Sequence, residues 1–172
     1  MEPMIPSDSG IEKSNLPDLC VELERKSAAL GAMLKPATSS VLEEHIRVIN
    51  SYYSNLIEGN TAHPREIREA MSGQYSDDPA KRDKQLESLA HIHVQKEFAG
   101  MDISHEYLVS SACFLDLHRT FCGQLPENLL IVKSESGEES RVIAGEFRTK
   151  EVKVGAHFPP DVSEISRYMA RI

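Results

Sequence analysis

The clearest pattern in the chain is a helical stripe of apolar residues between residues 40 and 58. Apolar side chains recur there every three or four positions, at Leu42, Ile46, Ile49, Tyr53, Leu56 and Ile57. Ser40 and Glu43 have the spacing of a capping box, and Gly59 is a natural helix stop. We therefore predict a helix over about 40–58 that packs through this stripe.

Four further helices are predicted in the first three quarters of the chain. Their apolar spacing, together with proline and capping residues at their starts, places them at about 17–35, 64–71, 79–98 and 104–123. The opening residues, 1–10, are typical of a flexible tail. The sequence thus predicts a mainly α fold, a helical bundle.

The pattern changes beyond Pro126, where short β-branched segments alternate with glycine and serine. These segments cover 129–132, 141–143 and 152–154, and they predict extended or hairpin structure. Helical spacing resumes after the double proline at 159–160 and continues to residue 172. A β-hairpin therefore interrupts the helical fold in the last quarter.

Composition and charge narrow the function classes. Of the 172 residues, 40% are hydrophobic and 27% are charged, the balance of a globular domain with a core. The net charge is −8 with both signs mixed, so there is no basic stripe for nucleic acid. No apolar run approaches the roughly 20 residues of a membrane span, and residues 1–10 are not a secretory signal. We expect no membrane contact and a cytoplasmic location.

Glu58 is the most informative charged residue. It occupies the last turn of the predicted helix, where a negative charge opposes the helix dipole and costs about 0.3–1 kcal/mol unless a cation compensates it. Ser54 lies one turn earlier on the same face. The pattern alone also fits a solvated helix end.

A family resemblance gives this stretch a meaning. SNLIEGN, residues 54–60, resembles the inhibitory motif of Fic proteins, a Ser or Thr followed four residues later by Glu and then by Gly and Asn. Further matches follow in the order of a Fic core: LDLHRTF at 115–121, AGEFRTKEVKVGAHFPP at 144–160, and the helix with Tyr168 and Met169. The resemblance covers about residues 46–172.

The resemblance implies a domain organisation. Residues 11–103 would form an N-terminal helical region with the inhibitory helix at about 40–58. Residues 104–172 would form the first part of a Fic core, including a flap at about 145–160. The flap of the family is a hairpin that docks an extended piece of a target protein by strand addition. The residues expected to dock the target are Lys150, Glu151, Val152, Lys153 and Val154. A plain surface hairpin is the alternative for this segment.

The resemblance also implies an activity and its control. Fic enzymes transfer AMP from ATP to hydroxyl side chains of proteins. The glutamate of the inhibitory helix pairs with an arginine of the catalytic loop and blocks the pose of the ATP γ-phosphate. Glu58 would inherit this inhibitory role, with Ser54, Gly59 and Asn60 as the residues that shape the helix end. A guanidinium that pairs with Glu58 is withheld from a phosphate, which agrees with the chemistry of both groups.

The chain departs from the family at the catalytic loop. The family motif HPFxxGNGRxxR supplies a general base, an acidic Mg²⁺ ligand and an anion-holding turn, and His63-Pro64 is the nearest match here. His91 and His93 point to different sides of a helix and make a poor metal site. We expect the chain to be truncated before this motif, with no catalytic residue and no metal ligand of its own.

These observations predict that the complete protein transfers AMP and that this chain alone does not. The complete protein is expected to use ATP and Mg²⁺, and neither is expected to bind to this part alone. The expected partner is a protein target docked at the flap, and a homodimer is a second candidate. Two rival interpretations remain open: a catalytically empty regulatory module that binds a protein partner, and an unrelated binding domain of winged-helix type.

Overall fold

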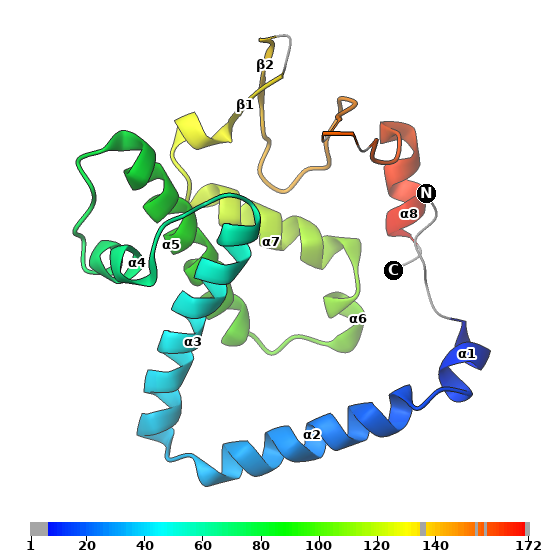
Figure 1. Cartoon of the computed structure of the whole chain (residues 1–172). Helices are drawn as coiled ribbons and strands as arrows, with labels where there is room; N and C mark the ends of the chain where they lie inside the picture. Colours follow the sequence, from blue (N-terminus) through cyan, green and yellow to red (C-terminus); the bar gives the residue numbers. More distant parts are fainter. Residues whose placement is uncertain (1–6, 135–136, 154, 157, 171–172) are drawn as a thin grey trace. The chain divides into compact units, whose positions relative to one another are not determined.

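The computed structural model describes residues 7–134, 137–153, 155–156 and 158–170. It is mainly helical with one two-stranded antiparallel hairpin, which confirms the predicted fold class (Figure 1). The chain divides into two compact units, Met1–Ile46 and Arg47–Ile172. We describe each unit by itself.

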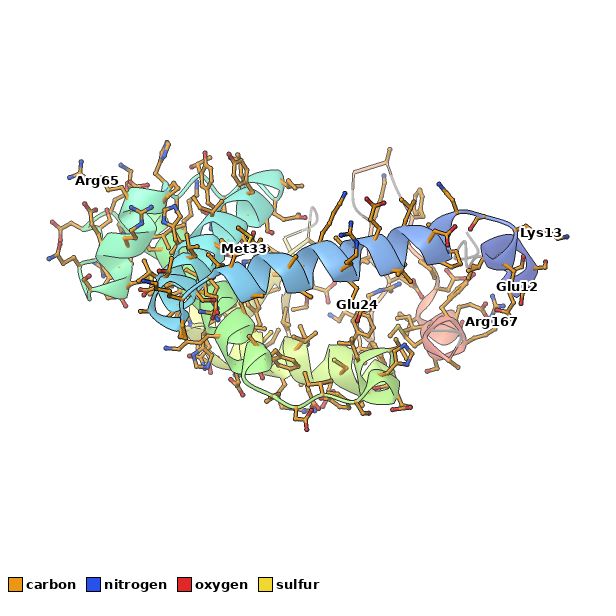
Figure 2. The ribbon with its side chains drawn as sticks, turned by 90° about the horizontal axis from the view of Figure 1, so that it is seen from below. Glu12, Lys13, Glu24, Met33, Arg65 and Arg167 are labelled. Carbon is orange, nitrogen blue, oxygen red and sulfur yellow. The ribbon has the colours of Figure 1, made fainter. Side chains whose placement is uncertain are left out.

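The first unit contains α1 (Asp8–Glu12), α2 (Leu16–Met33) and the first half of α3 (Pro36–Ile57). The predicted helix at 17–35 is confirmed as α2, with Pro17 in its first turn. Part of the expected tail is helical, because Ser7 caps α1 by accepting the Gly10 N–H at 3.2 Å. Apolar side chains of α2 are exposed, including Met33 near its C-terminal end (Figure 2).

The capping box predicted for α3 is wrong. The helix begins at Pro36, so Ser40 lies inside it, and the hydroxyl of Ser39 instead donates to Glu43 at 3.1 Å. Proline has a fixed φ that suits the first helical position, which explains the earlier start. The helix continues unbroken to Ile57, as the inhibitory interpretation requires.

The second unit contains the rest of α3 and four more helices before the hairpin. These helices are α4 (Pro64–Met71), α5 (Pro79–Ala99), α6 (His105–Leu108) and α7 (Ser111–Gly123). The predictions for α4 and α5 are confirmed, and the Asp78 side chain caps α5 by accepting the Ala80 N–H at 2.9 Å. No helix in the described part of the chain is long and apolar enough to cross a membrane.

The single helix predicted for 104–123 is wrong, because the structure has two helices there. Ser104 caps α6 through the Tyr107 N–H, and Ser110 caps α7 through the Cys113 N–H at 3.2 Å. A serine side chain that bonds the backbone two or three residues ahead competes with a continuing helix. The apolar spacing stays helical across Ser110, so it did not reveal that one helix ends and another begins there.

The core of the second unit lies where α3, α4 and α5 meet. Its buried side chains are Val48, Ala62, Ile67 and Ile92, with Tyr52 packed against them. Helix α5 also packs against α7, so it forms the centre of this unit (Figure 1).

Helix α3 does not bury the face that carries its predicted apolar stripe. Tyr53, Leu56 and Ile57 are 60%, 40% and 84% exposed, whereas Val48 and Ser51 are buried. The buried face is partly polar, because Ser51 donates a hydrogen bond to the Ser88 carbonyl of α5 at 3.1 Å. Hydrophobic spacing could not reveal a helix contact made by serine side chains.

The β-hairpin precedes the segment expected to form the flap. Its strands are β1 (Ile131–Lys133) and β2 (Glu139–Arg141), with Val132 opposite Ser140. A 3₁₀ turn, Glu127–Leu130, leads into β1, and a second one, Val162–Glu164, leads into α8 (Ile165–Met169). The expected strand at 152–154 is wrong for residues 152–153, and Val154 lies outside the described residues.

Candidate functional site

The C-terminal end of α3 is built as a left-handed helix cap. Gly59 has φ +86°, a conformation that favours glycine. The Asn60 N–H donates to the Asn55 carbonyl at 2.8 Å, and the Gly59 N–H donates to the Leu56 carbonyl at 3.1 Å. This pair of bonds is a Schellman motif, so the predicted stop at Gly59 is confirmed. Glu58 is thereby fixed as the first residue after the helix.

Asn60 fastens this turn to α5. Its side-chain Nδ2 donates to the Lys84 carbonyl at 3.1 Å and to Oε2 of Glu87 at 2.9 Å. Its Oδ1 accepts the Ala62 N–H at 3.0 Å. The residue is only 7% exposed, and a buried amide is stable when its polar atoms are satisfied in this way.

A cleft of about 520 Å³ opens beside this turn. It is bounded by the end of α3, one face of α5 and a single aromatic ring of α7. The lining residues are Asn55, Glu58, Gly59, Asn60, Ala80, Asp83, Lys84, Glu87 and Phe121. Three carboxylates and one ammonium group line the cleft, which makes it an anionic environment.

The charged groups of the cleft differ in whether they already have a hydrogen-bond partner. Glu87 accepts from Asn60, Asp83 accepts from Asn128 at 3.3 Å, and Lys84 Nζ donates to Thr61 Oγ1 at 3.0 Å. Within the described residues, no hydrogen bond or ion pair reaches the carboxylate of Glu58, which is exposed. Among the described residues, Glu58 is therefore the carboxylate of the cleft with no partner already in place.

The structure brings together three of the four residues assigned to the inhibitory motif. Glu58, Gly59 and Asn60 line the cleft, whereas Ser54 is exposed and is not part of its lining. Sequence reasoning missed Asp83, Glu87 and Phe121. The i and i+4 spacing of Asp83 and Glu87 was the available signal, because it places both carboxylates on one face of α5.

The described residues do not form a site that fits Mg²⁺ and ATP. No three His, Cys, Asp or Glu side chains of the described ranges lie together as metal ligands. Three carboxylates line the cleft, and their charge disfavours a triphosphate there. We therefore derive no step through a bound nucleotide from these residues.

The two histidines of α5 lie in different environments. His93 is exposed, and its Nε2 lies 3.1 Å from the Glu97 carboxylate. His91 is half-buried, and burial lowers its pKa because the charged imidazolium loses hydration. The two rings serve different faces of the helix, as their spacing predicts.

The segment that resembles the Fic core is anchored on α7. His118 Nδ1 accepts the Gly145 N–H at 3.0 Å, which places the ring proton on Nε2, 3.3 Å from the Cys122 sulfur. Arg119 forms an ion pair with Asp116. The Tyr107 hydroxyl donates to the same carboxylate at 2.6 Å, which raises the pKa of Tyr107 to about 12.

Gly145 cannot carry a side chain without displacing Arg119. Its φ is +76°, and a Cβ atom would lie 2.7 Å from Arg119 Nε. We expect Gly145→Ala to cost about 2 kcal/mol of unfolding free energy, and Gly137→Ala about 1 kcal/mol. Gly137 also has a positive φ, but open space surrounds it, so this variant isolates the backbone cost. Urea denaturation measures both, and equal losses would show that Arg119 yields without penalty.

Arg148 closes the loop that follows. Its guanidinium donates to the Lys150 carbonyl at 3.0 Å and also to the Pro160 carbonyl. Glu151 Oε1 accepts the Val162 N–H at 2.8 Å, so the two ends of the loop are held together. The described residues of 145–160 form no strand, so the hairpin expected there is not found among them, and these bonds join the two ends of the segment.

The residues expected to dock a target are partly engaged with the chain itself. Lys150 Nζ donates to Glu138 Oε1 at 2.5 Å, which lowers the pKa of Glu138 and links the loop to the hairpin. Lys153 Nζ lies 5.4 Å from the centre of the Phe158 ring. Val152 is 43% exposed and remains accessible.

The chain is similar to a known protein adenylyltransferase. The chain is 27% identical over 143 residues to a protein adenylyltransferase Fic from Culex quinquefasciatus. The match covers 83% of this chain and 25% of that protein, so the chain spans about a quarter of the relative's length. No family model matches the chain, and no solved structure matches it. This distant similarity supports a relationship to the Fic family.

Proposed function

We propose that this chain is the N-terminal regulatory and target-docking portion of a Fic-type enzyme that transfers AMP to proteins, and that Glu58 holds the enzyme inactive. The observation that carries the proposal is the Glu58 carboxylate at the edge of an acidic cleft, on a turn fixed by Gly59 and Asn60. Its position at the C-terminal end of α3 favours a cationic partner.

The cleft suits an arginine side chain. A guanidinium forms charge-assisted hydrogen bonds with a carboxylate and stacks on an aromatic ring. Glu58 supplies the carboxylate and Phe121 supplies the ring. An arginine from the rest of the enzyme that binds there is withheld from a phosphate, which accounts for inhibition without any chemistry in this chain.

Target docking is proposed for residues 145–160. Arg148 and Glu151 hold this loop closed, and exposed Val152 offers an apolar contact. An extended target segment would bind along the backbone of Lys150 to Lys153, with side-chain contacts on alternate positions.

A transfer experiment tests the proposal. The 172-residue chain is compared with a chimera in which it replaces the matching region of the mosquito relative, using ATP labelled on its α-phosphate. We expect label on protein only with the chimera, because the described residues offer no metal-ligand cluster.

Label transferred by the chain alone would contradict the proposed division of labour. A chimera that folds but transfers no AMP, while the chain alone binds a protein target, would favour a catalytically empty interaction module.

A further inference from the structure

We propose that Glu87 of α5 is a positioning residue for Glu58, acting through its hydrogen bond with Asn60. The inference rests on the proposed inhibitory function of Glu58. It assigns to α5 a role that the resemblance does not supply: holding the end of α3 in the geometry from which Glu58 can receive a cation.

A polar seam joins α3 to α5 along the face that leads to Glu58. Ser51 donates to the Ser88 carbonyl at 3.1 Å, and Asn55 Nδ2 donates to Ser88 Oγ at 3.1 Å. Ser88 Oγ in turn donates to the Lys84 carbonyl at 2.9 Å. Ser51 and Ser88 are both 0% exposed, so the bond from Ser51 to the Ser88 carbonyl forms without competition from water.

The seam ends at Asn60, where its strongest bond lies. Asn60 Nδ2 donates to the Glu87 carboxylate at 2.9 Å, and a hydrogen bond to a charged acceptor is stronger than a neutral one. The same nitrogen also donates to the Lys84 carbonyl. The turn that carries Glu58 is thus tied to α5 immediately beyond Glu58.

Apolar packing does not hold this end of α3 in the described part of the chain. Leu56 and Ile57 are exposed, and the buried core residues of α3 lie further up the helix. The Schellman bonds shape the turn but do not attach it to α5. The Asn60 side chain, with the Asn55–Ser88 bond before it and the Lys84–Thr61 bond after it, therefore limits how far Glu58 can move.

Glu87 also lines the cleft, so a direct contact with the cation is the competing explanation. Two substitutions separate the explanations. Glu87→Gln keeps an oxygen that can accept from Asn60 but loses the charge, whereas Glu87→Ala loses both. Asn60→Asp keeps the acceptor for Ala62 and replaces the donor that faces Glu87 with an oxygen.

Hydrogen exchange on the 172-residue chain tests the attachment. We expect the amides of Gly59 and Asn60 to exchange about tenfold faster in Glu87→Ala and Asn60→Asp. Glu87→Gln and the control Glu97→Ala, which alters an exposed residue of the same helix, should stay close to the unmodified chain. Unchanged exchange in Glu87→Ala, or faster exchange throughout α4 and α5, would overturn the proposal.

AMP transfer by the chimera tests the consequence. Glu87→Ala should raise transfer, Glu87→Gln should raise it much less, and Glu87→Ala should add nothing when Glu58 is already glycine. Equal activation by the Gln and Ala variants would show that Glu87 acts through its charge. If Glu58→Gly activates and Glu87→Ala does not, the positioning role fails and the proposed function stands. If Glu58→Gly is silent, the proposed function fails, while hydrogen exchange still decides whether Glu87 holds the turn.

Discussion

Glu58→Gly is expected to raise AMP transfer by the chimera roughly 5- to 150-fold. This factor corresponds to the coupling free energies typically found between two sites of a protein. The Glu58 carboxylate has no partner among the described residues and lies beside an acidic cleft. Removing it frees the arginine that it would hold. Label transferred from ATP to protein, including self-modification, measures the change.

Two companion variants define the cause. Glu58→Gln preserves the shape of the side chain and removes its charge, so it should activate nearly as much if the ion pair is the inhibitory contact. Glu44→Ala changes an exposed glutamate of the same helix and should leave transfer unchanged. Activity that does not respond to either Glu58 variant would remove Glu58 from the mechanism.

Elements whose ends are marked by proline, capping or glycine residues could be predicted from the sequence. Helix α4 runs from Pro64 to Met71 as expected, and α5 begins at Pro79 behind its Asp78 cap. The stop of α3 at Gly59 is likewise local, because a positive φ and two short-range hydrogen bonds define it. In each case the signal lies within a few residues of the feature.

Features that depend on tertiary contacts could not be predicted. The buried face of α3 is set by Ser51 and Asn55 meeting Ser88, residues far apart in the chain. Val152 and Lys153 are not in a strand, and Arg148 instead bonds the Pro160 carbonyl, twelve residues further along the chain. Spacing and propensity do not encode such bonds.

In the candidate site, too, some residues are identified by a local motif and others only by tertiary packing. Glu58, Gly59 and Asn60 are contiguous, so a motif identifies them together. Glu87 and Phe121 come from α5 and α7, and only packing of these helices brings them to the cleft. The spacing of Asp83 and Glu87 signals an acidic face of α5, but only the packing of the helices shows that this face borders Glu58.

The core of the second unit gives the largest expected loss of stability. Ile67 is 0% exposed and packs with Val48, Ala62 and Ile92, where α4 meets α3 and α5. Ile67→Ala should lower the unfolding free energy by about 3 kcal/mol, because it removes buried methylene groups and leaves a cavity. The corresponding fall in melting temperature is roughly 10 °C, measured by circular dichroism.

Ile57→Ala is the matched control for this substitution. Ile57 is 84% exposed at the end of α3, so the same change of side chain should alter the unfolding free energy by less than about 0.5 kcal/mol. Urea denaturation of the 172-residue chain measures both variants. A loss with Ile57→Ala as large as with Ile67→Ala would show that the apolar face of α3 is covered in solution, and it would contradict the exposed face described here.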